Sequence, residues 1–179
     1  MRGMGDGLLI VYTGGGKGKT TAALGLALRA AGYGRRICMV QFIKGSWHSG
    51  EIDSHKRLMP EFEIVRGGEG FVGIIDDKSP REDHERAARA TLEEAASRIR
   101  SGKYDVVILD EINYAAQMGL VSVQDVLDLA GQRRPGTDLV LTGNHAAPEV
   151  VEAADLVTEM REVKHPFQRG IPARKGIDF

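Results

Sequence analysis

A run of glycines, lysines and threonines near the N-terminus has the residue types and spacing needed to hold a phosphate chain. The apolar segment Leu8–Thr13 leads into a glycine-rich loop, which is followed by Lys19-Thr20-Thr21. Glycines let backbone N–H groups close around phosphate oxygens, because no Cβ stands in the way. Lys19 can place a positive charge on the outer phosphates, and the Thr20 hydroxyl can bind Mg²⁺. We therefore predict a nucleoside triphosphate site made of Gly14, Gly15, Gly16, Lys17, Gly18, Lys19, Thr20 and Thr21.

The strand and helix expected on either side of this loop support the prediction more strongly than the motif alone. The full pattern G-x-x-x-x-G-K-[ST] has glycine at its first position, where this chain has Thr13, while Gly18-Lys19-Thr20 is intact. A strand is expected before the loop and a helix after it, and the helix adds the positive end of its dipole. The alternative is a flexible turn with solvated lysines.

A second motif supplies carboxylates. The apolar run Val106–Leu109 ends in Asp110 and Glu111, which resembles a Walker B element. Ligands of doubly wound sheets gather at the carboxyl ends of the strands, and Mg²⁺ needs few protein ligands. We predict a metal site made of Thr20 with Asp110 or Glu111. The pattern leaves open which acid binds, because successive side chains of a strand point to opposite faces.

Strands and helices alternate along the chain, which indicates an α/β fold with a mostly parallel sheet and helices on both faces. One expected helix, Lys19–Ala31, is apolar nearly all round and is predicted to be buried. Pro80 is expected at the first position of a helix capped by Ser79. The remaining expected helices are Ile52–Leu58, one opened by Ser122, and Pro148–Ala154; the expected strands are Leu8–Thr13, Ile37–Phe42, Phe62–Val65, Asp105–Leu109, Leu139–Thr142 and Leu156–Met160.

Composition limits the possible functions. The chain has 179 residues, of which 42% are hydrophobic, and a net charge of −1. We expect a single domain over residues 1–179, with no broad electrostatic attraction for nucleic acid or an anionic membrane. The single cysteine, Cys38, lies in an expected buried strand, and this together with the absence of a signal peptide or apolar span favours a cytoplasmic location.

Several segments, taken together, resemble the P-loop type of ATP:corrinoid adenosyltransferase, and they occur in family order over nearly the whole chain. The resemblance implies a RecA-like P-loop fold and a reaction in which Co(I) of a reduced corrinoid attacks the 5′ carbon of ATP and triphosphate leaves. The matching segments are Thr13–Ala23, Val40–Trp47 with Gly50-Glu51, Val107–Glu111, Leu141–Gly143, Glu152–Met160, Val163–Phe167 and Gly176–Phe179.

The resemblance also assigns roles. It implies that Lys19, Thr20 and Glu111 carry the reaction, that Arg29 contacts ATP, and that Phe71 presses on the corrinoid face where a lower axial ligand would bind. Trp47 either lines the corrinoid pocket or covers the sheet edge. The resemblance further implies Mg²⁺ as cofactor, a homodimer, and a flavoprotein that reduces the corrinoid.

The chain departs from the family pattern at three positions. Gly15 replaces an asparagine, Gly73 replaces the second aromatic of the loop that carries Phe71, and Asn144 replaces an arginine. Two other functions therefore stay open at this point. A P-loop kinase or ATPase would release ADP, and a regulator would bind ATP or corrinoid without turnover.

Overall fold

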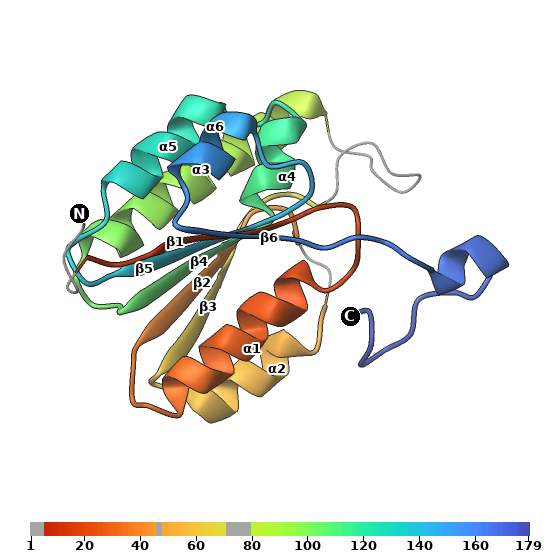
Figure 1. The fold of residues 1–179 in the computed structure, drawn as a ribbon, viewed down its shortest axis with the longest axis horizontal. Coiled ribbons are helices and arrows are strands. Elements are labelled where there is room, and N and C mark those ends of the chain that lie inside the picture. The colour runs from red at the N-terminus through yellow and green to blue at the C-terminus, as the bar shows by residue number, and fades with distance from the viewer. Residues whose placement is uncertain (1–5, 46–47, 71–79) are drawn as a thin grey trace.

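The centre of the fold is a six-stranded parallel sheet. A computed structural model describes residues 6–45, 48–70 and 80–179. In the described part the strand order is β3-β2-β4-β5-β1-β6, and every pairing is parallel (Figure 1). The predicted α/β fold is confirmed. The strands are β1 (Leu9–Thr13), β2 (Ile37–Gln41), β3 (Phe62–Arg66), β4 (Val106–Asp110), β5 (Asp138–Thr142) and β6 (Leu156–Glu159).

Helices cover both faces of this sheet. On one face lie α1 (Lys19–Ala31), α2 (Glu51–Ser54) and the 3₁₀ turn η1 (His55–Leu58) (Figure 1). The other face carries α3 (Arg81–Arg100), α4 (Ile112–Gln117), α5 (Val123–Gly131) and α6 (Pro148–Ala153). A second 3₁₀ turn, η2 (Pro166–Arg169), interrupts the C-terminal tail.

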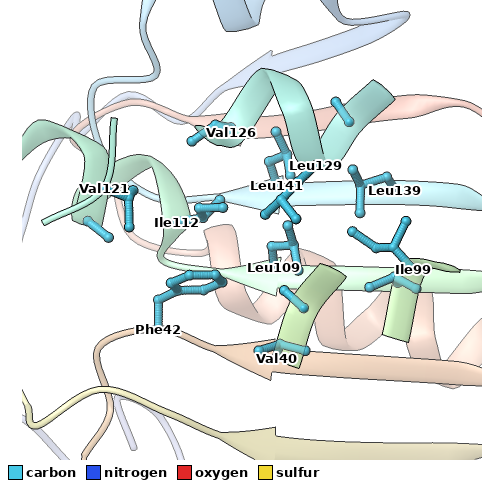
Figure 2. Close-up of a cluster of buried hydrophobic side chains, with 14 of the residues drawn as sticks. Val40, Phe42, Ile99, Leu109, Ile112, Val121, Val126, Leu129, Leu139 and Leu141 are labelled. Atoms are coloured by element: carbon cyan, nitrogen blue, oxygen red, sulfur yellow. The ribbon is translucent and has the colours of Figure 1, made fainter. Parts of the chain in front are cut away.

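The sheet separates two hydrophobic layers. Val40, Leu109 and Leu141 point toward α3, α4 and α5, whose Ile99, Ile112 and Leu129 complete that layer (Figure 2). The intervening strand residues point the other way and pack against the alanines of α1. Strands covered on both faces need apolar residues at every position, which explains why β2 and β4 show no polar alternation. Cys38 is fully buried in β2, as predicted.

The prediction that α1 is buried all round is only half right. Ala23, Ala27 and Ala30 are buried against the sheet, whereas Leu28 is 60% exposed and Gly25 is also exposed. The small alanines let the helix lie close to the sheet. The apolar residues of its outer face are therefore not part of the core between α1 and the sheet.

The start of one helix differs from expectation, and one further helix was not expected. Pro80 occupies the N-cap of α3 rather than its first helical position, and the predicted cap residue Ser79 lies outside the described residues. Helix α4 was not predicted, because its six residues are too few to show a period. The helix expected after Ser122 is confirmed as α5. Ser122 and Asp125 form a capping box, since the Ser122 hydroxyl accepts from the Asp125 N–H and the Asp125 carboxylate accepts from the Ser122 N–H. Among the described residues, none of the helices is long and apolar enough to cross a bilayer.

Candidate functional site

The glycine-rich loop joins β1 to α1 at the carboxyl edge of the sheet. Gly14 and Gly18 have φ values of 93° and 115°, which favour glycine. The Gly16 N–H donates to the Met160 carbonyl over 2.6 Å, and a Cβ at Gly14 would meet that same oxygen at 2.5 Å. The loop is thus fixed from outside by the chain that follows β6, and glycine is required where the two approach.

Lys19 lies at the centre of the loop. Its side chain is buried, with the residue 8% exposed, and its Nζ donates to the carbonyls of Gly14 at 2.8 Å and Gly16 at 2.7 Å. Burial lowers the pKa of Lys19, and the charge of Glu111 opposes that shift. The loop carbonyls thus accept from two of the three N–H groups of this ammonium, which holds it at the cavity.

Asp110 is the acid that contacts the phosphate loop. The Thr20 hydroxyl donates to Asp110 Oδ1 over 2.8 Å, and the Thr142 hydroxyl donates to the same oxygen over 2.8 Å. Asp110 is fully buried, so desolvation raises its pKa while Lys44 and the two hydroxyls oppose the rise. Thus Asp110, the last residue of β4, directly accompanies Thr20.

Glu111 occupies a different position from Asp110. It has a left-handed backbone, with φ 63°, its N–H donates to Thr142 Oγ1 over 2.9 Å, and it precedes α4. Its side chain lines the cavity beside Lys19 and Lys44. Burial and the neighbouring Asp110 raise the pKa of Glu111 to about 7. The two acids therefore have different surroundings: Asp110 accepts from the Thr20 hydroxyl, and Glu111 lines the cavity.

A cavity of about 690 Å³ opens from the phosphate loop, a size typical of small-molecule sites. Its lining includes both polar and apolar residues. The polar lining comprises Lys17, Gly18, Lys19, Thr20, Thr21, Lys44, Ser49, Gly50, Glu51, Ser54 and Glu111; the apolar lining comprises Leu24, Gly25, Leu28, Leu58 and Phe62; the tail adds Gly176, Ile177, Asp178 and Phe179.

The C-terminal tail is a part of this site that sequence reasoning missed. Its last residues form a turn in which the Arg174 N–H donates to Asp178 Oδ2 over 2.8 Å. Lys17 Nζ lies 3.3 Å from Asp178 Oδ1. Lys17, predicted to contact phosphate, is therefore paired with the tail. The only sequence signal was the family segment Gly176–Phe179, which carried no assigned role.

A buried amide links Asp110 to the far side of the cavity. Gln41 Nε2 lies 3.4 Å from Asp110 Oδ2 and donates to Glu51 Oε1 over 3.2 Å. Gln41 is fully buried at the end of β2. The sequence signal for the Gln41–Glu51 pair was a polar residue, Gln41, at the end of an otherwise apolar strand.

The structure does not bring all predicted residues to the cavity. Arg29 is exposed on α1 and is absent from the described lining. Gly14, Gly15 and Gly16 are also absent from that lining, and an added Cβ at Gly15 would meet no described atom within 4 Å. Trp47 and Phe71 lie outside the described residues.

The loops that lead toward those two aromatics pack against each other. A Cβ at Gly68, after β3, would stand 2.0 Å from the Phe42 carbonyl oxygen, and one at Gly45 would stand 2.6 Å from the Gly70 nitrogen. Both glycines have positive φ. The chain after β2 and the chain after β3 are thereby held together at the edge of the sheet where the cavity opens.

This fold and site define the class of the protein: a RecA-like P-loop nucleotide-binding protein. A KaiC-like protein from Pyrococcus horikoshii shares the fold, with a TM-score of 0.50 over 87% of this chain and 74% of that one, at 15% identity.

Sequence comparison gives the family. Residues 5–179 match the family described as ATP:corrinoid adenosyltransferase BtuR/CobO/CobP, and the chain belongs to it. Among its relatives, the corrinoid adenosyltransferase of Escherichia coli is 36% identical over 97% of this chain and 86% of its own length. The corresponding proteins of a Sinorhizobium species and Pseudomonas aeruginosa are 40% and 39% identical, again over 97% of this chain, and over 80% and 84% of their own lengths.

Proposed function

We propose that this protein transfers the 5′-deoxyadenosyl group of ATP to Co(I) of a reduced corrinoid, in the synthesis or salvage of adenosylcobalamin. The observation that carries the proposal is the family match over residues 5–179, in a chain whose Lys19 and Thr20–Asp110 pair are both in place. No kinase or hydrolase feature outside the shared loop competes with it in the described residues.

The reaction needs little acid–base chemistry from the protein. The Co(I) electron pair forms a bond to C5′, the C5′–O bond breaks, and its electrons leave with triphosphate. The nucleophile is supplied by the corrinoid substrate, so the protein has to position C5′ and stabilise the leaving charge. Catalysis then rests on charge placement around the triphosphate.

Lys19 is the main cation in that role. It stands at the loop between carbonyls that a phosphate oxygen can replace. The loop amides from Gly14 to Thr21 and the N-terminus of α1 add further donors. Lys17 and Lys44 line the cavity and are additional cations that we assign to ATP, Lys17 after it leaves Asp178. Arg29 lies outside the described lining, and its proposed contact with ATP rests on the family resemblance alone.

The residues present fit Mg²⁺. The Thr20 hydroxyl and the carboxylates of Asp110 and Glu111 are oxygen donors, which Mg²⁺ prefers, and few protein ligands suffice. Bound to the triphosphate, Mg²⁺ supplies charge neutralisation for the leaving group. Thr20 would be a ligand of the ion, Asp110 would hold the Thr20 hydroxyl in place, and Glu111, which lines the cavity, would supply a second carboxylate.

The corrinoid is proposed to enter at the carboxyl edge of the sheet, beside the loops after β2 and β3. This placement is supported by the close packing at Gly45 and Gly68 and by the family roles of Phe71 and Trp47. We further propose a homodimer, a cytoplasmic location and a reduced flavoprotein as electron donor, all from the family resemblance.

An anaerobic assay tests the function. Protein, MgATP and chemically reduced cob(I)alamin are incubated together, and the light-sensitive Co–C absorbance and the released triphosphate are both followed. The two products should form in equal amounts. If ADP forms without a Co–C bond, the assay is repeated with incomplete corrinoids. The same result with those substrates would instead identify a kinase or hydrolase.

A further inference from the structure

The chain between β6 and the last residues of the tail forms a projection, residues 161–175, which we call the arm. The arm begins at the phosphate loop, where the Gly16 N–H donates to the Met160 carbonyl, and it returns to the same loop at the Lys17–Asp178 ion pair. Between these two anchors the arm extends beyond the sheet and lies apart from α6 (Figure 1). Nearly all of its residues are exposed.

The tip of the arm has a defined shape that is held by its own hydrogen bonds. At the start of η2, His165 Nδ1 accepts from the Phe167 N–H over 3.3 Å. The Gly170 N–H donates to the Phe167 carbonyl over 2.9 Å, and the Ile171 N–H donates to the Pro166 carbonyl over 3.2 Å. This turn presents Phe167 with 77% of its surface exposed. An ordered turn that exposes an aromatic ring is suited to docking, because little conformational entropy is left to lose on binding.

A second exposed surface with apolar side chains lies on α6 and β6, residues 148–159, which we call the acidic strip. Strand β6 is at the edge of the sheet, and all four of its residues are exposed. The exposed apolar side chains of the strip are Val151, Leu156 and Val157. An edge strand with unpaired backbone groups and apolar side chains is a surface that proteins usually cover or protect.

The arm and the acidic strip carry opposite charges. The arm holds five arginines and lysines and one acidic residue, whereas the strip holds four acidic residues and no arginine or lysine. Complementary charge favours one partner and one orientation over others. Both surfaces belong to the same chain, so a second copy offers each of them its complement. Two copies can therefore make the same contact twice, in a closed arrangement with two-fold symmetry.

We propose that the arm docks on the acidic strip of a second copy of this chain, and that two copies exchange arms about a two-fold axis. The inference rests on the homodimer proposed above and names its interface. Phe167 is the central apolar contact, against the exposed apolar side chains of the partner's strip. The cations of the arm, among them Lys164 and Arg169, face the carboxylates of that strip. Because the arm is anchored at the phosphate loop at both ends, each phosphate loop lies at the base of an arm that the partner holds.

Sedimentation velocity over a series of protein concentrations, without substrates, measures the dissociation constant of the dimer. We expect the parent to dimerise, more weakly at high salt, and Phe167→Ala to raise the dissociation constant at least tenfold. Phe167 is exposed and outside the core, so this variant should fold as the parent does. The matched control is Tyr33→Ala, since Tyr33 is an aromatic residue just after α1 that is 85% exposed and outside both surfaces. This control should dimerise as the parent does.

Cross-linking identifies the two surfaces directly. Val163→Cys places a thiol on the arm and Val151→Cys places one on the acidic strip, in a chain whose own Cys38 is buried. Both valines are exposed, so neither change touches the core. A flexible bismaleimide should join an equal mixture of the two single variants into a covalent dimer, and should do so to a much smaller extent with either variant alone.

Several results would overturn this interface. They are a parent that stays monomeric, a Phe167→Ala variant with an unchanged dissociation constant, and equal cross-linking in the mixture and in the separate variants. Adenosyl transfer is assayed on the same preparations. Transfer by a monomeric parent would refute the interface and leave the proposed reaction in place, whereas a parent that dimerises through the arm without transfer would refute the reaction alone.

Discussion

The Thr20 hydroxyl and the Asp110 carboxylate are joined by a 2.8 Å hydrogen bond, which ties the first turn of α1 to the end of β4. Thr142 of β5 donates to the same carboxylate oxygen over 2.8 Å. A buried carboxylate in this position sets the direction of the Thr20 oxygen toward the cavity. Because β4 and β5 are neighbours in the sheet, Asp110 and Thr142 lie side by side at the proposed magnesium site.

Removing the charge of Asp110 should impair MgATP use without unfolding the protein. Asp110→Asn retains an oxygen that can accept from Thr20 but lacks the negative charge that supports a bound cation. We expect adenosyl transfer to fall about 100-fold, as for other groups that stabilise charge in a transition state. The rate should be measured over a Mg²⁺ series, with Thr20→Ser as the control that keeps the hydroxyl. Unchanged activity in Asp110→Asn would show that the charge of Asp110 does not support the bound cation.

Glu111 should make the nucleotide-free protein less stable as the pH rises. Its pKa is about 7 in the folded protein, above the usual 4.5, so the folded state holds the proton more tightly than the unfolded state. The free energy of unfolding should therefore fall between about pH 4.5 and pH 7, by up to about 3 kcal/mol from this group. Urea titrations at several pH values measure this slope.

The control for that prediction is Glu111→Gln, which carries no titrating proton. Its slope over the same range should be smaller than that of the parent, with Asp110 supplying the remainder because its pKa is raised as well. An identical slope in the two proteins would show that Glu111 is not held in a desolvated position.

Asp178 should compete with the triphosphate for Lys17. A backbone hydrogen bond from Arg174 holds the pKa of Asp178 below its usual value, so this carboxylate is charged at neutral pH. Asp178→Asn keeps an oxygen for the Arg174 N–H and removes the charge, so MgATP affinity should rise a few-fold at low salt. The gain should shrink at high salt. Glu152→Gln, an exposed charge change on α6, is the control, and weaker binding in Asp178→Asn would mean that the charge helps to hold the nucleotide.

Cys38 should be unreactive in the native protein. The side chain is fully buried in β2, and burial raises the pKa of the thiol to about 12. A thiol reagent should modify no cysteine at pH 8 in buffer and one cysteine in guanidinium chloride. Rapid native labelling would contradict the buried position of β2.

The sequence predicts those parts of the site that depend on local pattern. Gly18-Lys19-Thr20 and the acidic pair at the end of an apolar strand were identified because strand, loop and helix follow one another in the chain. Which of the two acids contacts the Thr20 hydroxyl needed the structure, which shows Asp110 in this position. The Lys17–Asp178 pair joins residues far apart in sequence, and no local pattern encodes it.

The outer face of α1 shows a different limit. Its apolar residues led to the prediction that this face is buried. An apolar pattern indicates a preference for contacts away from water, but it does not identify the contacting group. Leu28 and Gly25 border a cavity instead. The inner face of α1 therefore packs on the sheet, and its outer face borders the cavity.

The most direct test of the account is single-turnover adenosyl transfer by the parent protein and by Lys19→Ala under anaerobic conditions. Formation of the Co–C bond and release of triphosphate are followed together, with MgATP and cob(I)alamin supplied in excess. The account predicts equal amounts of both products from the parent and neither from Lys19→Ala, which should melt at a similar temperature. Co–C bond formation by Lys19→Ala at the parent's rate, or ADP as the parent's product, would contradict it.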